Sequence, residues 1–187
     1  MESTALPKRA SPARLLVPLL IGAAVSLGLG IYGNAHDPTG RSIFSLVFTK
    51  TINMKAWFAT GAVTLAIFQL LSALSIFRVI RIPRAVPRWL PPLHRVSGLA
   101  LFAITVPVAY HCLWALGFQD YSTRVLIHSI AGCFFFGAFT AKVIVVESKS
   151  LPRLALPVAG GLVFSALIVI WYTSALWFFR EFGFPSF

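Results

Sequence analysis

Three of the four histidines in this sequence lie in one stretch that is otherwise mostly apolar. The stretch covers residues 93–142 and reads LHRVSGLALFAITVPVAYHCLWALGFQDYSTRVLIHSIAGCFFFGAFTAK, with histidines at His94, His111 and His128. An imidazole is costly to leave unpaired in a bilayer, so ionisable side chains within apolar segments are candidates for function. Neutral imidazoles in such a place could serve as axial ligands of haem iron. Burial of the haem and hydrogen bonds around it would then adjust the reduction potential of the iron.

The composition predicts an integral membrane protein. Of the 187 residues, 58% are hydrophobic and only 11% are charged, whereas a soluble domain carries about 25% charged residues. The mean hydropathy of +0.84 leads to the same conclusion. The net charge of +11 does not indicate nucleic-acid binding, because the 16 Lys and Arg residues are scattered between apolar runs and form no basic face.

Five segments are apolar enough for a membrane span, which needs roughly 20 residues. Backbone polar groups must be satisfied within lipid, so each span is expected to be a helix, and the alternation of a transmembrane barrel is absent. We therefore expect an all-α fold, a bundle of five transmembrane helices forming a single domain over residues 1–187. The predicted spans are about 15–33, 56–77, 96–116, 125–146 and 154–179.

The distribution of positive charge predicts the orientation. With the N-terminus inside, eleven of the 16 Lys and Arg residues fall in inner segments and five in outer ones, which favours an inside N-terminus and an outside C-terminus. The most basic inner segment, RVIRIPRAVPRWLPPLHR at 78–95, is also rich in proline, which argues against a continuous helix there. We expect the protein to reside in a bacterial plasma membrane.

Two of the histidines are predicted to lie at one depth. The outer loop GFQDYSTR (117–124) joins the third and fourth spans, with His111 about five residues before it and His128 about four residues after it. At ~1.5 Å per residue, both lie some 6–8 Å below the outer boundary on neighbouring helices. His94 lies ~25 Å from His111 along the axis, at the inner boundary, and is expected to be an interfacial residue.

Other side chains near this pair have the chemistry to assist it. Arg124 lies one turn nearer the outer water than His128, where haem propionates would emerge, and its forked donors suit carboxylates. Lys50 and Lys55 are further outer candidates. Gly132, one turn below His128, leaves room for a flat group beside the backbone; the alternative is that it serves close helix packing, which is common in membranes.

The segments LHRVSG…VAYHC and RVLIHSIAG resemble the histidine-bearing core of small membrane b-type cytochromes, the cytochrome b561 and ferric-reductase-like transmembrane group. The resemblance covers about residues 93–146 and rests on histidine placement. It implies a helical bundle in which histidine pairs hold b haems, with His111 and His128 as the axial ligands here. Typical members have two such pairs on opposite sides of the membrane, whereas this chain has material for one haem b only.

The sequence therefore predicts a membrane electron-transfer protein or subunit with one haem near the outer face. It would exchange electrons with a quinone or with a periplasmic or extracellular redox protein, alone or with partner subunits; whether it is part of an oxidoreductase stays open. One alternative is a cofactor-free membrane anchor whose histidines make interhelical hydrogen bonds. Another is a copper or zinc site, for which the side-chain types are suitable; its candidates are His36, His111, Cys112 and His128.

Overall fold

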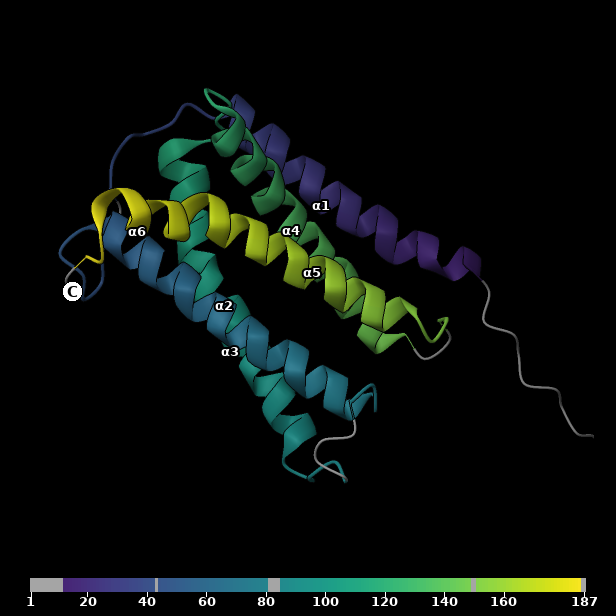
Figure 1. Ribbon diagram of the computed structural model, residues 1–187. Helices are drawn as coiled ribbons and strands as arrows, with labels where there is room; N and C mark the ends of the chain where they lie inside the picture. Colours follow the sequence, from purple (N-terminus) through teal and green to yellow (C-terminus); the bar gives the residue numbers. More distant parts are fainter. Residues whose placement is uncertain (1–11, 43, 81–84, 149–150, 186–187) are drawn as a thin grey trace, which may run out of the picture.

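Five long helices form the protein in this computed structural model, which describes residues 12–42, 44–80, 85–148 and 151–185 (Figure 1). All five are long and apolar enough to cross a membrane, and the described residues contain no strand. This confirms the predicted all-α architecture of an integral membrane protein. The helices are α1 (Leu16–Ala35), α2 (Thr51–Ile76), α3 (Leu90–His111), α4 (Thr123–Glu147), α5 (Ala155–Trp171) and a short α6 (Trp177–Phe182) that extends the fifth span.

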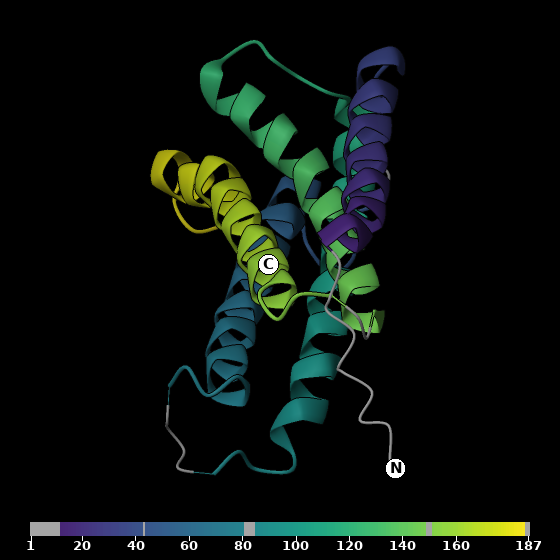
Figure 2. The ribbon, with the colours of Figure 1, turned by 90° about the vertical axis from the view of Figure 1, so that its right-hand side faces the viewer.

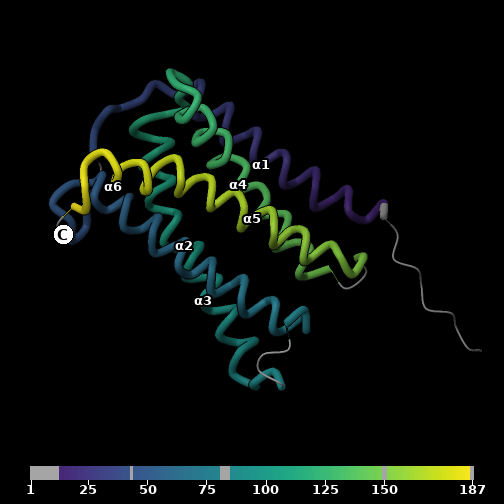
Figure 3. Tube along the Cα trace, viewed as in Figure 1, coloured from purple at the N-terminus to yellow at the C-terminus, as the bar shows by residue number. Residues whose placement is uncertain are grey.

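The order of the helices in space differs from their order in the chain. Helix α1 packs along α4, α4 along α5, α5 along α2, and α2 along α3 (Figures 1 and 3). In this order α4 lies between α1 and α5, and α5 is the middle helix. Helix α1 begins at the end of the bundle opposite to α6 (Figure 1).

Small residues allow α1 and α4 to approach closely. A Cβ atom added at Gly22 would lie 2.7 Å from the Gly137 carbonyl oxygen, and one added at Gly137 would collide with the Gly22 carbonyl and with Ser26. Membrane helices commonly associate through such small-residue contacts because close backbone approach maximises van der Waals packing. This crossing fixes α4 against α1 rather than against α3.

Helix α3 starts earlier than the span predicted from position 96. It begins at Leu90, and Pro91 and Pro92 occupy its first turn. The first turn has no intrahelical acceptors for its N–H groups, so proline is tolerated there and its fixed φ suits the helix. His94 thus belongs to α3, while residues 81–84 of the basic segment lie outside the described residues.

Two turns of π-helix interrupt the third and fifth spans at the end of the bundle that carries the loop 117–124. We name this end the outer end and the opposite one the inner end, after the orientation expected from the sequence. The first, η2 (Cys112–Leu116), directly follows His111, and the second, η3 (Tyr172–Leu176), joins α5 to α6. A π-helical turn holds an extra residue, so it rotates the following side chains relative to regular helical spacing. Such turns occur frequently at functional sites.

A compact apolar core holds α2, α3, α4 and α5 together. Phe135 of α4 is its largest fully buried side chain, at 1% exposure. Phe135 and Leu167 belong both to this core and to the lining of a cavity above it, so the core forms the cavity floor. The other buried members are Ala62, Val63, Ala66, Leu101, Val163 and Ala166.

Candidate functional site

A cavity of about 620 Å³ lies at the outer end of the bundle, bounded by residues from all six α-helices. Helices α3 and α4 are consecutive, as expected, but each packs mainly on other helices. Their outer ends are splayed apart, with the connecting loop stretched between them (Figure 2). The cavity occupies this end of the molecule, and its walls are predominantly apolar.

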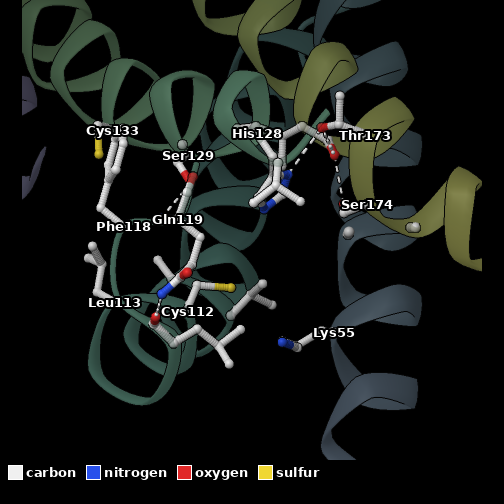
Figure 4. A pocket seen from close by; sticks show the side chains of 18 of the residues that line it. Lys55, Cys112, Leu113, Phe118, Gln119, His128, Ser129, Cys133, Thr173 and Ser174 are labelled. Atoms are coloured by element: carbon white, nitrogen blue, oxygen red, sulfur yellow. Dashed lines mark hydrogen bonds between the residues drawn. The ribbon is translucent and has the colours of Figure 1, made fainter. Parts of the chain in front are cut away.

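His128 lines the cavity and is held by the fifth span. Its Nδ1 lies 3.1 Å from the Thr173 hydroxyl, as Figure 4 shows. That hydroxyl lies 2.7 Å from the Val169 carbonyl oxygen, to which it donates its proton. Nδ1–H is therefore the donor to Thr173, which leaves Nε2 as an unprotonated acceptor available to the cavity.

His111 lies at the same outer end but does not border the cavity. It is five residues before the end of its span at Leu116, and His128 is five residues after the start of α4 at Thr123. The His111 side chain is 6% exposed, and its Nδ1 is buried without a hydrogen-bond partner. The next residue, Cys112, does line the cavity. An unsatisfied buried nitrogen costs about 1–3 kcal/mol, so this imidazole is not explained by packing alone.

Arg124 lies at the cavity wall but is already engaged by the fifth span. Its Nη1 donates to the Thr173 carbonyl oxygen at 2.6 Å, and its guanidinium lies 3.7 Å from the centre of the Trp177 ring. This cation–π contact and the hydrogen bond tie the beginning of α4 to the end of the fifth span. Arg124 therefore lies beside the cavity, as expected from its position in the sequence, but its guanidinium donors are partly used by contacts within the protein.

Gly132 opens into the cavity. A Cβ added at this position would meet no atom within 4 Å, and the residue lines the cavity one turn below His128. The glycine of α4 that serves close helix packing is Gly137, at the crossing with α1. Of the two roles considered from the sequence, space beside the backbone is therefore the one that the geometry of Gly132 supports.

His36 is outside the cavity and supports the outer loop. Its ring stacks between those of Tyr32 and Trp114, at centroid distances of 5.2 and 4.7 Å, and its Nε2 lies 3.2 Å from the Trp114 carbonyl oxygen. Across the described ranges, no three His, Cys, Asp or Glu side chains are grouped closely enough to hold one metal ion. The geometry thus does not assemble the copper or zinc site considered from His36, His111, Cys112 and His128.

His94, at the inner end, contacts a hydroxyl group of a neighbouring helix in the same way as His128 does. Its Nδ1 lies 2.7 Å from the Ser72 hydroxyl of α2, and that hydroxyl lies 2.7 Å from the Phe68 carbonyl oxygen. Gln69 of the same helix donates to the Ser97 hydroxyl at 2.7 Å. His94, predicted to be interfacial, also takes part in a polar contact between α2 and α3.

The role of Thr173 and the two π-helical turns were not predicted from the sequence. Thr173 lies in an apolar segment 45 residues beyond His128, and threonines of this kind usually bond only to their own helix, as Thr173 also does. The contact between Thr173 and His128 could not be predicted from regular helical spacing along the fifth span, because the π-helical turn η3 changes which face Thr173 occupies. The only available signal was Thr173 itself, a polar residue near the predicted outer end.

Comparison with curated proteins and with solved structures finds no significant match to this chain. A protein-family model matches residues 15–186, which include helices α1 to α6 and all the residues that line the outer cavity. The chain therefore belongs to a family of unknown function, DUF6529.

Proposed function

We propose that this protein binds one b-type haem in the outer cavity and acts as a membrane electron-transfer protein or subunit. The observation that carries the proposal is His128, whose Nδ1 is held by Thr173 and whose Nε2 is left to a largely apolar cavity of about 620 Å³. Histidine ligands typically donate their other ring N–H to a fixed partner, which sets the tautomer and orients the ring.

The dimensions and lining of the cavity support a flat, mostly apolar cofactor. Ligand cavities usually measure about 300–1,000 Å³ and combine apolar walls with a few polar groups. Gly132 leaves open space one turn from His128, and Lys55 and Arg124 supply positive charge without any Asp or Glu in the lining. A haem bound there would supply one-electron chemistry, with its potential set by the axial ligands and by burial.

His111 is the proposed second axial ligand, a role that requires its ring to turn from its buried position toward the cavity, which His111 does not border in this structure. It lies at the outer end with His128, and its Nδ1 is a buried polar atom without a partner. Its neighbour Cys112 reaches the cavity wall. Ligation would give a use to an imidazole that packing leaves unsatisfied.

The charge distribution supports an inside N-terminus, an outside C-terminus and a cavity near the outer face. In a bacterial plasma membrane, electrons would be exchanged with a quinone in the bilayer or with a periplasmic redox protein. Lipid would surround the bundle, whose five spans carry many exposed apolar side chains.

A reduced-minus-oxidised visible spectrum of the detergent-solubilised protein tests the proposal. We expect a Soret band and a reducible α band in the wild type, loss of both in His128→Ala, and an altered or lost α band in His111→Ala. His36→Ala is the matched control, because its ring stacks outside the cavity, and it should keep the full spectrum. Colourless wild-type protein after expression with adequate haem supply would refute the proposal.

A second candidate, a cofactor-free membrane anchor, is favoured by a different observation. His128 bonds to Thr173 across α4 and the fifth span, and His94 bonds to Ser72 across α3 and α2. Both imidazoles can therefore serve as interhelical hydrogen-bonding groups. Under this function the purified protein is colourless, and His128→Ala lowers the free energy of unfolding by only about 0.6 kcal/mol.

A further inference from the structure

Lys55 places a positive charge beside the cavity without a compensating acid. It lines the cavity from α2, and Figure 4 shows its amino group directed toward the space between the helices. The position is four residues after the start of α2 at Thr51, or ~6 Å along the helix axis. No Asp or Glu lines the cavity, and within the described part of the chain Lys55 has no carboxylate partner.

Arg124, the other cation of the lining, differs from Lys55 in its contacts. Its guanidinium donates to the Thr173 carbonyl and covers the Trp177 ring, so internal contacts account for its position. For Lys55 the structure shows no such contact. An ionisable side chain that faces a cavity within a membrane-spanning helix marks a functional site by default.

The charge of Lys55 also lies near the proposed haem ligands. Lys55 lines the same cavity as His128 and as Cys112, the residue next to His111. A group bound between these residues would therefore experience the same charge. Because the remaining walls are mostly apolar, a suitable occupant has an apolar body and an anionic end.

We propose that Lys55 binds the carboxylate of the molecule that occupies the outer cavity. This deepens the proposed function and, where the occupant is haem, rests on it: the carboxylate is then a haem propionate. The same chemistry, a carboxylate on an apolar body, is also offered by a fatty acid from the membrane. Haemin and a fatty acid, each compared with its ester, distinguish the two sources.

The test compares ligands with and without the carboxylate on full-length protein in detergent. Haemin and haemin dimethyl ester are titrated into apoprotein of the wild type, Lys55→Gln, Lys55→Arg and Lys50→Gln, with binding followed by the Soret band. Lys50 is exposed and absent from the cavity lining, so Lys50→Gln is the matched control. We expect Lys55→Gln to weaken haemin binding by about tenfold or more, because hydrogen bonds to charged groups are the stronger kind.

The ester gives the decisive comparison. Lys55→Gln should leave binding of the dimethyl ester unchanged, and Lys55→Arg should largely restore haemin binding because it keeps the charge. Equal weakening of haemin and its ester, or no weakening of either, would overturn the assignment of Lys55. Lys50→Gln should bind both probes as the wild type does.

A parallel titration separates failure of the haem function from failure of this inference. Parinaric acid, a fluorescent fatty acid, is compared with its methyl ester on the same variants. If haemin does not bind but Lys55→Gln selectively weakens the free acid, the haem function fails and the carboxylate site stands. If neither carboxylate probe depends on Lys55, the inference is wrong whether or not haem binds.

Discussion

His94 and Ser72 form, at the inner end of the bundle, the same imidazole–hydroxyl pair that His128 and Thr173 form at the outer end. The Ser72 hydroxyl is 2.7 Å from His94 Nδ1 and also 2.7 Å from the carbonyl of Phe68 in its own helix. In both pairs the hydroxyl proton is used by the helix backbone, so its oxygen accepts from Nδ1–H. The difference is that only His128 has a cavity of about 620 Å³ beside it.

The inner pair is therefore expected to contribute to stability and not to cofactor binding. Ser72→Ala and His94→Ala should each lower the free energy of unfolding by about 0.6 kcal/mol, the average for interhelical hydrogen bonds in membranes. The haem spectrum should keep its wild-type intensity and α-band position. Thermal unfolding in detergent and a difference spectrum measure the two quantities. A lost Soret band in His94→Ala, with the fold intact, would show that His94 is a ligand instead.

The outer pair is expected to control the properties of the bound haem. Thr173→Val removes the acceptor that holds Nδ1–H of His128, while Thr173→Ser keeps it. Loss of such a supporting hydrogen bond typically weakens metal-site affinity by about 10–100-fold. We expect faster haem loss and a shifted midpoint potential in Thr173→Val, and values near the wild type in Thr173→Ser. A potential unchanged in both variants would mean that Thr173 does not act through the imidazole.

The sequence was sufficient to predict the five spans and to place two histidines near the ends of consecutive spans. Spans follow from the length of apolar chain that a bilayer requires, and His111 and His128 are each near the loop that joins their helices. The splay of α3 from α4 could not be predicted, because it depends on which distant helices each prefers. The crossing of Gly22 with Gly137 fixes α4 on α1, and no local pattern relates those two glycines.

The side-chain roles were less predictable than the helices. The sequence placed Arg124 beside the loop before α4, but its contacts with Thr173 and Trp177 depend on the fifth span. His111 is buried, and its neighbour Cys112 borders the cavity instead. Helical spacing gives the face of a residue on its own helix, whereas the neighbour of that face is set by the tertiary fold.

The two glycines of α4 provide a matched pair of substitutions. Gly132→Leu should fill cavity space and prevent haem binding. Little stability should be lost, because a Cβ at this position meets no atom within 4 Å. Gly137→Ala should instead lower the free energy of unfolding by about 1–3 kcal/mol, since overpacking forces the backbones apart. Haem content and thermal unfolding of both variants measure these effects. Equal destabilisation by the two changes would show that Gly132 also serves helix packing.

Arg124 tests whether a cation at the outer end binds the cofactor or holds the helices. Its hydrogen bond to the Thr173 carbonyl and its position over Trp177 predict that Arg124→Gln lowers the free energy of unfolding by about 1.5–3 kcal/mol. Because this loss loosens the cavity wall rather than removing a carboxylate partner, haemin and haemin dimethyl ester should be weakened equally. Titration of both probes, with thermal unfolding of the same sample, checks the prediction. Selective weakening of haemin would instead make Arg124 the propionate partner that its sequence position first indicated.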